Sequence, residues 1–372
     1  MPIVINQEHP LYERGKKKFG DQMRTPQEQA THQNRDKHVL IVNTMPDKAL
    51  QQTEDDFVEP ILGASPEGTI IRLHFAKVNG FQRDHDANTY INAHYKEFAE
   101  IKEHGMDAVI FTGMNHPPGM KYNQQPFYEP LVEMIEWAEE NTPSSLFSCA
   151  ALHLLMEHKH GITRTKLNHK RHGFYEHDIL DTAHPLTRRL NDTFNAAHSR
   201  WHEVYEHEFE KAGMNILMKS EEAGVLLVTS ADGLNQVGLQ GHPEYKLKAL
   251  GAEYVRDYNQ YVNGETTIIP TLPEHYFRGK SLEVATALHE QLLNGTAEII
   301  RLDQIIEKSP KSLKDIPPMK LTTDCDALIR NWLSAVHKTT NFNLHEQYMD
   351  EINPKDVFGR NPLANGQSLE AA

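Results

Sequence analysis

The fold is decided by the stretch Ser144-Ser145-Leu146-Phe147-Ser148-Cys149-Ala150-Ala151-Leu152, in which a short apolar strand runs into a helix at Cys149. Small residues flank the cysteine, as a sharp strand-to-helix turn requires because its backbone is crowded. The thiol there faces the positive end of the helix, which favours thiolate over thiol. The pattern predicts a nucleophile elbow with cysteine in place of serine. The alternative is a small buried hydrophobe, the usual fate of a free cysteine.

Strand and helix patterns alternate around this turn. Four apolar runs have the length of buried strands: 38–43, 69–75, 108–112 and 144–148. Three stretches with helical spacing lie between them: 53–62, 90–104 and 128–141. This alternation predicts an α/β fold, with a mostly parallel sheet covered by helices on both faces. Three close apolar runs at 215–218, 225–229 and 236–239 leave no room for helices and predict a β meander that extends the sheet.

The composition excludes several classes of function. The chain has 372 residues and a formal net charge of −14, which does not suit a broad nucleic-acid surface. Its two cysteines form no disulfide framework and fit a reducing compartment. No apolar run approaches the roughly 18 residues that span a bilayer, and the N-terminus lacks the apolar core of a signal peptide. We therefore expect a soluble, cytoplasmic, acidic globular protein, without nucleic-acid or membrane partners.

Changes in texture predict four segments along the chain. Residues 1–37 are polar and have little periodicity, so we expect an N-terminal arm that packs on the surface or on a partner. The catalytic domain is expected over 38–262. A looser, helical C-terminal extension follows over 263–353, with helices at 281–294 and 325–337. We expect the tail, 354–372, to be disordered.

A base for the cysteine is predicted just after the last strand of the meander, in Gly241-His242-Pro243-Glu244-Tyr245. A cysteine nucleophile needs a base within hydrogen-bond reach, and that base needs an orienting group. His242 and Glu244 are two residues apart on an extended segment, so their side chains point to the same side. One turn can thus supply both groups. The alternative is a polar surface loop.

Substrate contacts are predicted in His198-Ser199-Arg200, which we place in a loop before Trp201. A serine hydroxyl can bond a polar substrate group, and an arginine can bind a carboxylate with two parallel hydrogen bonds. The alternative is a helix cap next to a surface arginine. Arg256 lies on the helix after the histidine turn, and its spacing alone indicates a surface charge.

Metal and cofactor motifs are not found. The 23 histidines are scattered without ligand spacing, so we expect no metal site. His202-Glu203 with His207 is similar to a zinc-protease motif, but the position that needs histidine holds Glu206. The glycine-rich fingerprint of dinucleotide-binding proteins is absent. We expect no bound cofactor.

Taken together, six motifs in this order along the chain resemble the homoserine O-succinyltransferase family: Asn43–Asp47, Thr112-Gly113, Ser148-Cys149, Gly173–His177, His198–Arg200 and Gly241–Tyr245. The resemblance runs from about residue 37 to residue 262 and resumes at Asn331-Trp332-Leu333. It implies a sheet fold like that of class I glutamine amidotransferases, which is flavodoxin-like.

The resemblance also implies roles for the matching residues. Cys149 would carry an acyl-thioester, His242 would accept the proton, and Glu244 would be its partner. Lys170, Ser199 and Arg256 would contact the substrate. The co-substrate would be an acyl-CoA, either succinyl-CoA or acetyl-CoA, and the acceptor L-homoserine, a step of methionine biosynthesis. We also expect a homodimer.

Alternatives stay open at this point. The family commonly has Thr-Gly-Ala-Pro where this chain has 112–118, so the acyl group is not decided, and serine or another hydroxy amino acid is an alternative acceptor. Residues 279–320 are predicted to be an insertion. The rival functions are a glutamine amidotransferase and a non-catalytic binding protein. For the oxyanion, the donors expected are the amides of Ala150 and of the turn 45–48.

Overall fold

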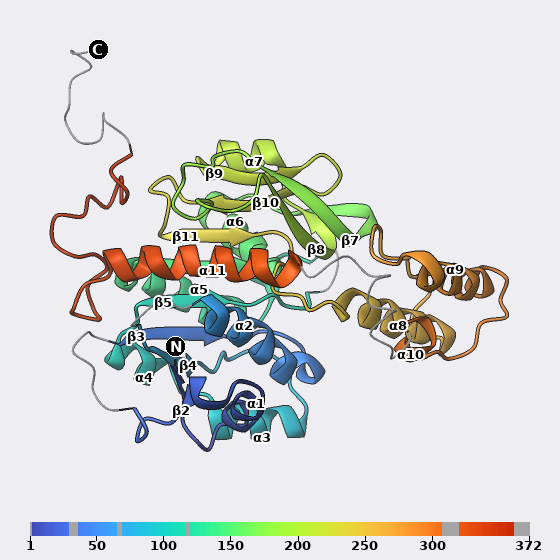
Figure 1. Ribbon diagram of the computed structural model, residues 1–372, viewed down its shortest axis with the longest axis horizontal. Coiled ribbons are helices and arrows are strands. Elements are labelled where there is room, and N and C mark those ends of the chain that lie inside the picture. Colours follow the sequence, from blue (N-terminus) through green and yellow to red (C-terminus); the bar gives the residue numbers. More distant parts are fainter. Residues whose placement is uncertain (1, 30–35, 65–68, 117–119, 307–319, 361–372) are drawn as a thin grey trace, which may run out of the picture.

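A computed structural model describes residues 2–29, 36–64, 69–116, 120–306 and 320–360. An eleven-stranded sheet runs through the molecule in the order β2-β1-β4-β3-β5-β6-β11-β10-β9-β7-β8 (Figure 1). Six of its pairings are parallel and four are antiparallel. The predicted α/β fold with a mostly parallel sheet is confirmed.

The parallel half of the sheet contains the predicted strands. Their bounds are β3 (Lys37–Val42), β4 (Ile71–Phe75), β5 (Ala108–Phe111), β6 (Ser144–Ser148) and β11 (Gln236–Leu239). Side chains alternate between the two faces of a strand, and both sets are apolar here because both faces are covered. Val39 and Ile41 belong to the core on one face, and Leu40 and Val42 belong to the core on the other.

Helices cover both faces, as predicted. The first face is packed by α2 (Leu50–Ala64) and α11 (Lys320–Thr339), which contact each other. The opposite face is packed by α4 (Phe98–His104), α5 (Tyr128–Asn141), α6 (Ala150–His160) and α7 (Glu206–Lys211). Short 3-10 turns lie at Gly20–Gln22, Asp47–Ala49 and Tyr122–Gln124. In the part of the chain that the structure describes, no helix is both long and apolar enough to cross a membrane.

The N-terminal segment differs from the surface arm that we expected. It forms β1 (Ile3–Val4), α1 (Pro10–Phe19) and β2 (Met23–Arg24). Strand β1 pairs with β4 in parallel, so this segment makes the edge of the sheet. Strands of two residues are too short to show the alternation on which a sequence prediction depends.

The stretch predicted as one helix over 90–104 is two helices. Helix α3 (His85–His94) ends at Tyr95, whose backbone is extended, and α4 begins after Glu97. Between them Lys96 forms a β-bridge with Ala76. Glu97 starts the second helix with a capping box that it shares with Glu100, a local stabilisation that favours a new helix over a continued one.

The antiparallel half contains a long hairpin that the sequence did not predict. The meander is confirmed as β9 (Asn215–Ser220), β10 (Gly224–Thr229) and β11. Beyond it lie β7 (Thr165–Ile179) and β8 (Thr193–Glu203), which pair with each other. The prediction of a loop at His198–Arg200 was wrong, because these residues lie within β8. The first half of β7 is polar and largely exposed, which removes the apolar signature of a strand.

The C-terminal extension packs in two places. Its helices α9 (Gly279–Leu293) and α10 (Leu302–Ile305) join α8 (Ala249–Val262), the last helix of the predicted catalytic domain, in a lobe beside β7 and β8 (Figure 1). The apolar core of this lobe includes Phe174 of β7 and Ala197 of β8. Helix α11 returns to the sheet, where the indole N–H of Trp332 donates to Ser144 Oγ at 2.8 Å. In the tail that we expected to be disordered, Val357 is buried and Arg360 pairs with Asp181 at 2.6 Å. Residues 361–372 lie outside the described residues.

Candidate active site

Cys149 lies at a sharp turn between β6 and α6. Its φ of 48° and ψ of −106° lie in a region that residues with a side chain rarely adopt. Hydrogen bonds on both sides hold this conformation: the Cys149 N–H donates to Leu239 O at 2.6 Å, and the His153 N–H donates to Cys149 O at 3.1 Å. The strained turn presents the thiol at the N-terminus of α6, as in a nucleophile elbow.

The turn after β11 supplies an oriented histidine. His242 Nδ1 lies 2.8 Å from Glu244 Oε1, and the hydroxyl of Ser148 donates to the same oxygen at 3.3 Å. The backbone N–H of His242 donates to the backbone oxygen of Ala197 at 2.7 Å. The ring of Tyr245 stacks on the imidazole of His242 with 4.4 Å between the ring centroids. The imidazole is therefore held by a carboxylate, a backbone bond and an aromatic ring.

The two predicted groups meet beside Gly113, the residue after the predicted third strand. A methyl group at Gly113 would lie 3.9 Å from Cβ of Cys149 and 3.9 Å from Cε1 of His242. Burial acts to lower the pKa of His242, but the charges of Glu244 and Cys149 and a hydrogen bond with the thiol raise it well above the ordinary value. The charged forms of the cysteine and the histidine thus stabilise each other.

A cavity of about 450 Å³ opens over the thiol. Its walls come from the segment after β5, the start of α6, and β8 between Ser199 and His202. Cys149 itself is only 8% exposed, so a reacting group reaches it through this cavity. The size suits a small ligand or one end of a larger one.

A second group of predicted residues converges on Glu253 of α8. Lys170 Nζ lies 3.2 Å from Glu253 Oε2, and the hydroxyl of Ser199 donates to the same oxygen. The guanidinium of Arg256 lies 3.8 Å from this carboxylate. The hydroxyl of Tyr245 donates to the other oxygen, Oε1, at 2.7 Å. Because Tyr245 also stacks on His242, the cluster is connected to the catalytic turn.

The charges around Glu253 keep it ionised. Burial alone would raise the pKa of this carboxyl, but the positive charges of Lys170, Arg256 and His172 and the Ser199 hydrogen bond hold it far below its usual range. Sequence reasoning missed Glu253. The one available signal was its place three residues before Arg256, which puts both on one face of the helix.

Arg200 is not brought into this cluster. It follows Ser199 on β8, and successive side chains of a strand point to opposite faces. Its guanidinium donates to Glu203 Oε1 at 2.9 Å and to Ala223 O at 2.7 Å, and the residue is 3% exposed. It borders the cavity over Cys149 but is held by these internal partners.

Of the expected oxyanion donors, the amide of Ala150 has the better geometry. Ala150 is the first residue of α6, and the first amides of a helix have no acceptor within it. In the turn at 45–48 the Met45 amide is already used, because it donates to Asn43 Oδ1 at 3.2 Å.

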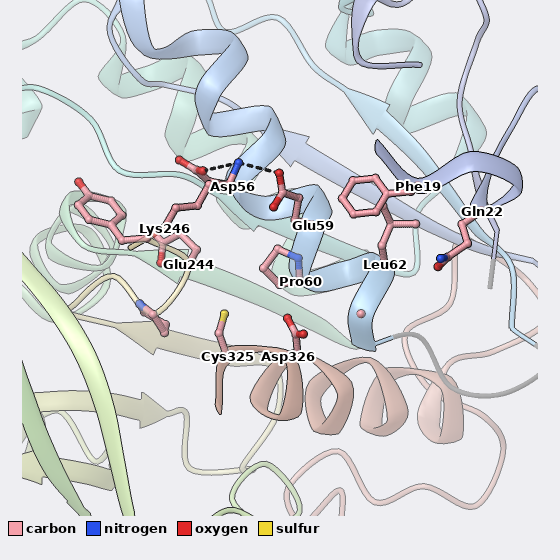
Figure 2. Close-up of a pocket in the computed structure, with 13 residues that line it drawn as sticks. Phe19, Gln22, Asp56, Glu59, Pro60, Leu62, Glu244, Lys246, Cys325 and Asp326 are labelled. Atoms are coloured by element: carbon pink, nitrogen blue, oxygen red, sulfur yellow. Dashed lines mark ion pairs between the residues drawn. The ribbon is translucent and has the colours of Figure 1, made fainter. Parts of the chain in front are cut away.

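Behind the catalytic turn lies a second cavity, of about 320 Å³, between α2 and α11. Figure 2 shows Glu244 and Lys246 on one side of it and Cys325 and Asp326 of α11 on the other. Lys246 Nζ pairs with Asp56 at 3.2 Å and with Glu59 at 2.7 Å. Glu244 Oε2 is buried and has no hydrogen-bond partner among the described residues.

The two cysteines differ in the environment of their thiols. Burial and the negative charges of Glu244 and Asp326 raise the pKa of the Cys325 thiol well above its ordinary value. Cys325 therefore stays a protonated thiol, whereas Cys149 faces an imidazole that can hold its proton. The geometry favours Cys149 as the nucleophile.

Comparison with known proteins shows the family of the chain. The family model described as homoserine O-succinyltransferase matches residues 2–342, which includes both the N-terminal segment and the range 279–320 that we expected to be an insertion. A homoserine O-succinyltransferase of Nitrosococcus oceani is 33% identical over 360 residues, which cover 96% of this chain and 99% of the relative. One from Cardiobacterium hominis is 33% identical over 368 residues, with 97% and 99% covered.

Among solved structures, a glutamine amidotransferase from Methylobacillus flagellatus is similar with a TM-score of 0.45 at 11% identity, over 86% of this chain and 98% of the other. The sequence matches extend over nearly the whole chain and over nearly the whole of each relative. The chain therefore belongs to the homoserine O-succinyltransferase family and is an acyltransferase.

Proposed function

We propose that the protein transfers a succinyl group from succinyl-CoA to the hydroxyl of L-homoserine through a thioester on Cys149. The family supports the acceptor and a role in methionine biosynthesis. The observation that carries the thioester is the elbow itself, where a strained cysteine faces an imidazole that is 2.8 Å from a buried carboxylate. Such an arrangement activates a thiol for attack on an acyl group.

In the first half-reaction the Cys149 thiolate attacks the thioester carbonyl of succinyl-CoA. The amide of Ala150 donates to the oxygen that becomes negative. The bond between the carbonyl carbon and the CoA sulfur breaks, and the leaving thiolate takes the proton from His242. The raised pKa of His242 favours this start, because it favours the imidazolium that supplies the proton.

In the second half-reaction the neutral His242 accepts the proton of the homoserine hydroxyl. The hydroxyl oxygen attacks the thioester, the carbon–sulfur bond to Cys149 breaks, and thiolate and imidazolium are restored together. Glu244 holds the ring through Nδ1 in both steps, which leaves Nε2 for the proton transfers. A thioester keeps the acyl group reactive while the first product leaves.

The Glu253 cluster is the proposed acceptor site. Homoserine carries an ammonium and a carboxylate, and the cluster offers a carboxylate beside an arginine and a lysine. The guanidinium of Arg256 pairs with Asp257 at 2.7 Å, but its side chain is 56% exposed, so it can exchange this surface pair for two hydrogen bonds to the substrate carboxylate. Tyr245 connects this cluster to His242 and sets the distance between the bound acceptor and the base. The role of Arg200 in substrate binding stays a prediction.

The test is a mass measurement on the intact protein. Incubation with succinyl-CoA should add one succinyl group to Cys149, and acetyl-CoA should add less or none. Homoserine should then discharge the label faster than serine does. Cys325→Ser is the matched control, because it should label normally while Cys149→Ser should not. Label on Cys325, or release of ammonia from glutamine without any acyl label, would contradict the proposal.

A further inference from the structure

Three histidines from three different elements converge at a place that the transfer reaction does not use. They are His38 of β3, His74 of β4 and His104, the last residue of α4, and one ring nitrogen of each lies within 4.8 Å of the others. His38 is the second residue of its strand, so the cluster lies away from the carboxyl ends where Cys149 is found. His74 and His104 are 36 and 66 residues from His38, which hid the group from the sequence analysis.

Hydrogen bonds among the three rings cannot pair all of the ring nitrogens that meet here. His38 Nδ1 lies 3.0 Å from His74 Nε2 and 2.8 Å from His104 Nε2. A ring nitrogen has either one proton or one lone pair, so it cannot make a full hydrogen bond to both neighbours. One cation can accept all three lone pairs at once. Metal–nitrogen bonds of about 2.0–2.1 Å in a tetrahedral site place two nitrogens roughly 3.3 Å apart, which needs only a small opening of the cluster.

Imidazole binds a metal through the lone pair of a neutral ring nitrogen. The charged groups near the cluster include Lys96, Arg72 and His345. Arg72 is paired with Asp36 at 2.6 Å, and Lys96 is exposed to solvent, which screens its charge.

We propose that His38, His74 and His104 bind one divalent transition-metal ion and that the site prefers Zn²⁺. Imidazole is a preferred ligand of zinc, and three histidines with one open position form a known coordination pattern for it. His104 is exposed, so an ion can enter from solvent and be completed by water. The ion would join the end of α4 to β3 and β4 and so stabilise this side of the sheet. The site is independent of the proposed acyl transfer.

The test uses the full-length chain without a histidine tag, in a Cys149→Ser background so that the active-site thiolate cannot capture the ion. After treatment with a chelator, Zn²⁺ is titrated in competition with a chromophoric chelator. We expect one Zn²⁺ per chain and a higher thermal midpoint with the metal. His104→Gln should weaken binding by at least about tenfold, since loss of even an outer-shell partner commonly costs 10- to 100-fold. His85→Gln, at an exposed histidine outside the cluster, should change nothing.

Two further variants separate ligation from a structural effect. His104→Cys should restore tight binding, because thiolate is also a zinc ligand, and should give Co²⁺ an intense visible spectrum. His74→Gln should lose binding as His104→Gln does. Acyl transfer by the chain with native Cys149 should be the same with and without Zn²⁺. A failure of the metal proposal would therefore leave the proposed acyl transfer intact, and the reverse also holds. No saturable binding, or equal affinity in His104→Gln and the parent, would overturn the proposal.

Discussion

The parallel half of the sheet holds the groups that we propose react, whereas the antiparallel half and the lobe beside it hold the groups that we assign to the acceptor. Cys149 follows β6 directly, His242 lies three residues after the end of the neighbouring strand β11, and short backbone hydrogen bonds hold both. Lys170 and Ser199 come from the β7–β8 hairpin and meet Glu253 and Arg256 of α8 through ion pairs and hydrogen bonds. Changes in the first region should therefore affect chemistry with little effect on stability. Changes in the second should affect acceptor binding, and stability where a buried charge is lost.

The largest effect is expected for Cys149→Ser. Serine is nearly the same size, so the elbow should fold, but its hydroxyl is far harder to deprotonate than a thiol. Turnover should fall by roughly 10⁴-fold or more, the scale on which loss of a nucleophile acts. Circular dichroism and thermal unfolding should match the parent. Turnover that is unchanged would remove Cys149 from the mechanism.

The next effect is expected for the base and its partner. His242→Ala should lower both thioester formation and its discharge, by about 10²- to 10⁴-fold, because one imidazole serves both steps. Glu244→Gln should cost less, since it removes charge and orientation but leaves the imidazole. It should also lower the pKa of His242, because Glu244 is a main cause of its elevation. Single-turnover labelling of Cys149 over a pH series measures both the loss of rate and the pKa of His242. A larger loss of rate for Glu244→Gln than for His242→Ala would reverse the assigned roles.

The same division explains what the sequence could reveal. The elbow was predictable because strand, small residues and helix are all present in nine consecutive residues, and the base and its partner are two residues apart. Glu253 was not predictable in the same way, because Lys170 and Ser199 lie 83 and 54 residues from it. Both partners lie on a hairpin that was not recognised, since the polar first half of β7 has no apolar alternation. Local patterns identify groups within one turn, whereas clusters built across elements require the packed structure.

Glu253→Gln tests whether the second region is held together by this buried carboxylate. Removing one partner of a buried ion pair costs about 3–5 kcal/mol when the other charge is left uncompensated. The loss here should be smaller, because Lys170 and Arg256 also pair with Asp257, at 2.9 and 2.7 Å, and the Glu253 side chain is 16% exposed. Since the folded-state pKa of Glu253 is lowered, its contribution to stability is present above the unfolded value of about 4.3 and is lost as the pH falls below it. The difference in free energy of unfolding between parent and variant should therefore be full at pH 7 and shrink in acid. Urea denaturation over this range measures it.

A control defines the size of a surface effect in the same assay. Glu222→Gln changes an exposed carboxylate that forms a surface ion pair with His275 at 2.7 Å, so it should alter stability by less than about 1 kcal/mol. A Glu253→Gln effect no larger than this, or one that does not shrink as the pH falls, would mean that the cluster is not held by the charge of Glu253.

The smallest effect is expected for Arg256→Lys, which tests the acceptor side alone. Lysine keeps the positive charge but loses the planar fork that binds a carboxylate with two hydrogen bonds. We expect the apparent KM for homoserine to rise about tenfold, which corresponds to about 1.4 kcal/mol. Thioester formation from succinyl-CoA should stay normal, because the two half-reactions use different partners. Arg301→Lys is the matched control, since Arg301 is exposed and pairs with Asp303 away from the cluster.

The measurement is burst labelling of Cys149 followed by discharge at several homoserine concentrations. A variant that labels slowly but discharges normally would place Arg256 on the CoA side of the site. A variant unchanged in both steps would make Arg256 the surface charge that its spacing alone indicated. A rise in KM confined to discharge would instead show that the antiparallel half binds the acceptor while the parallel half performs the chemistry.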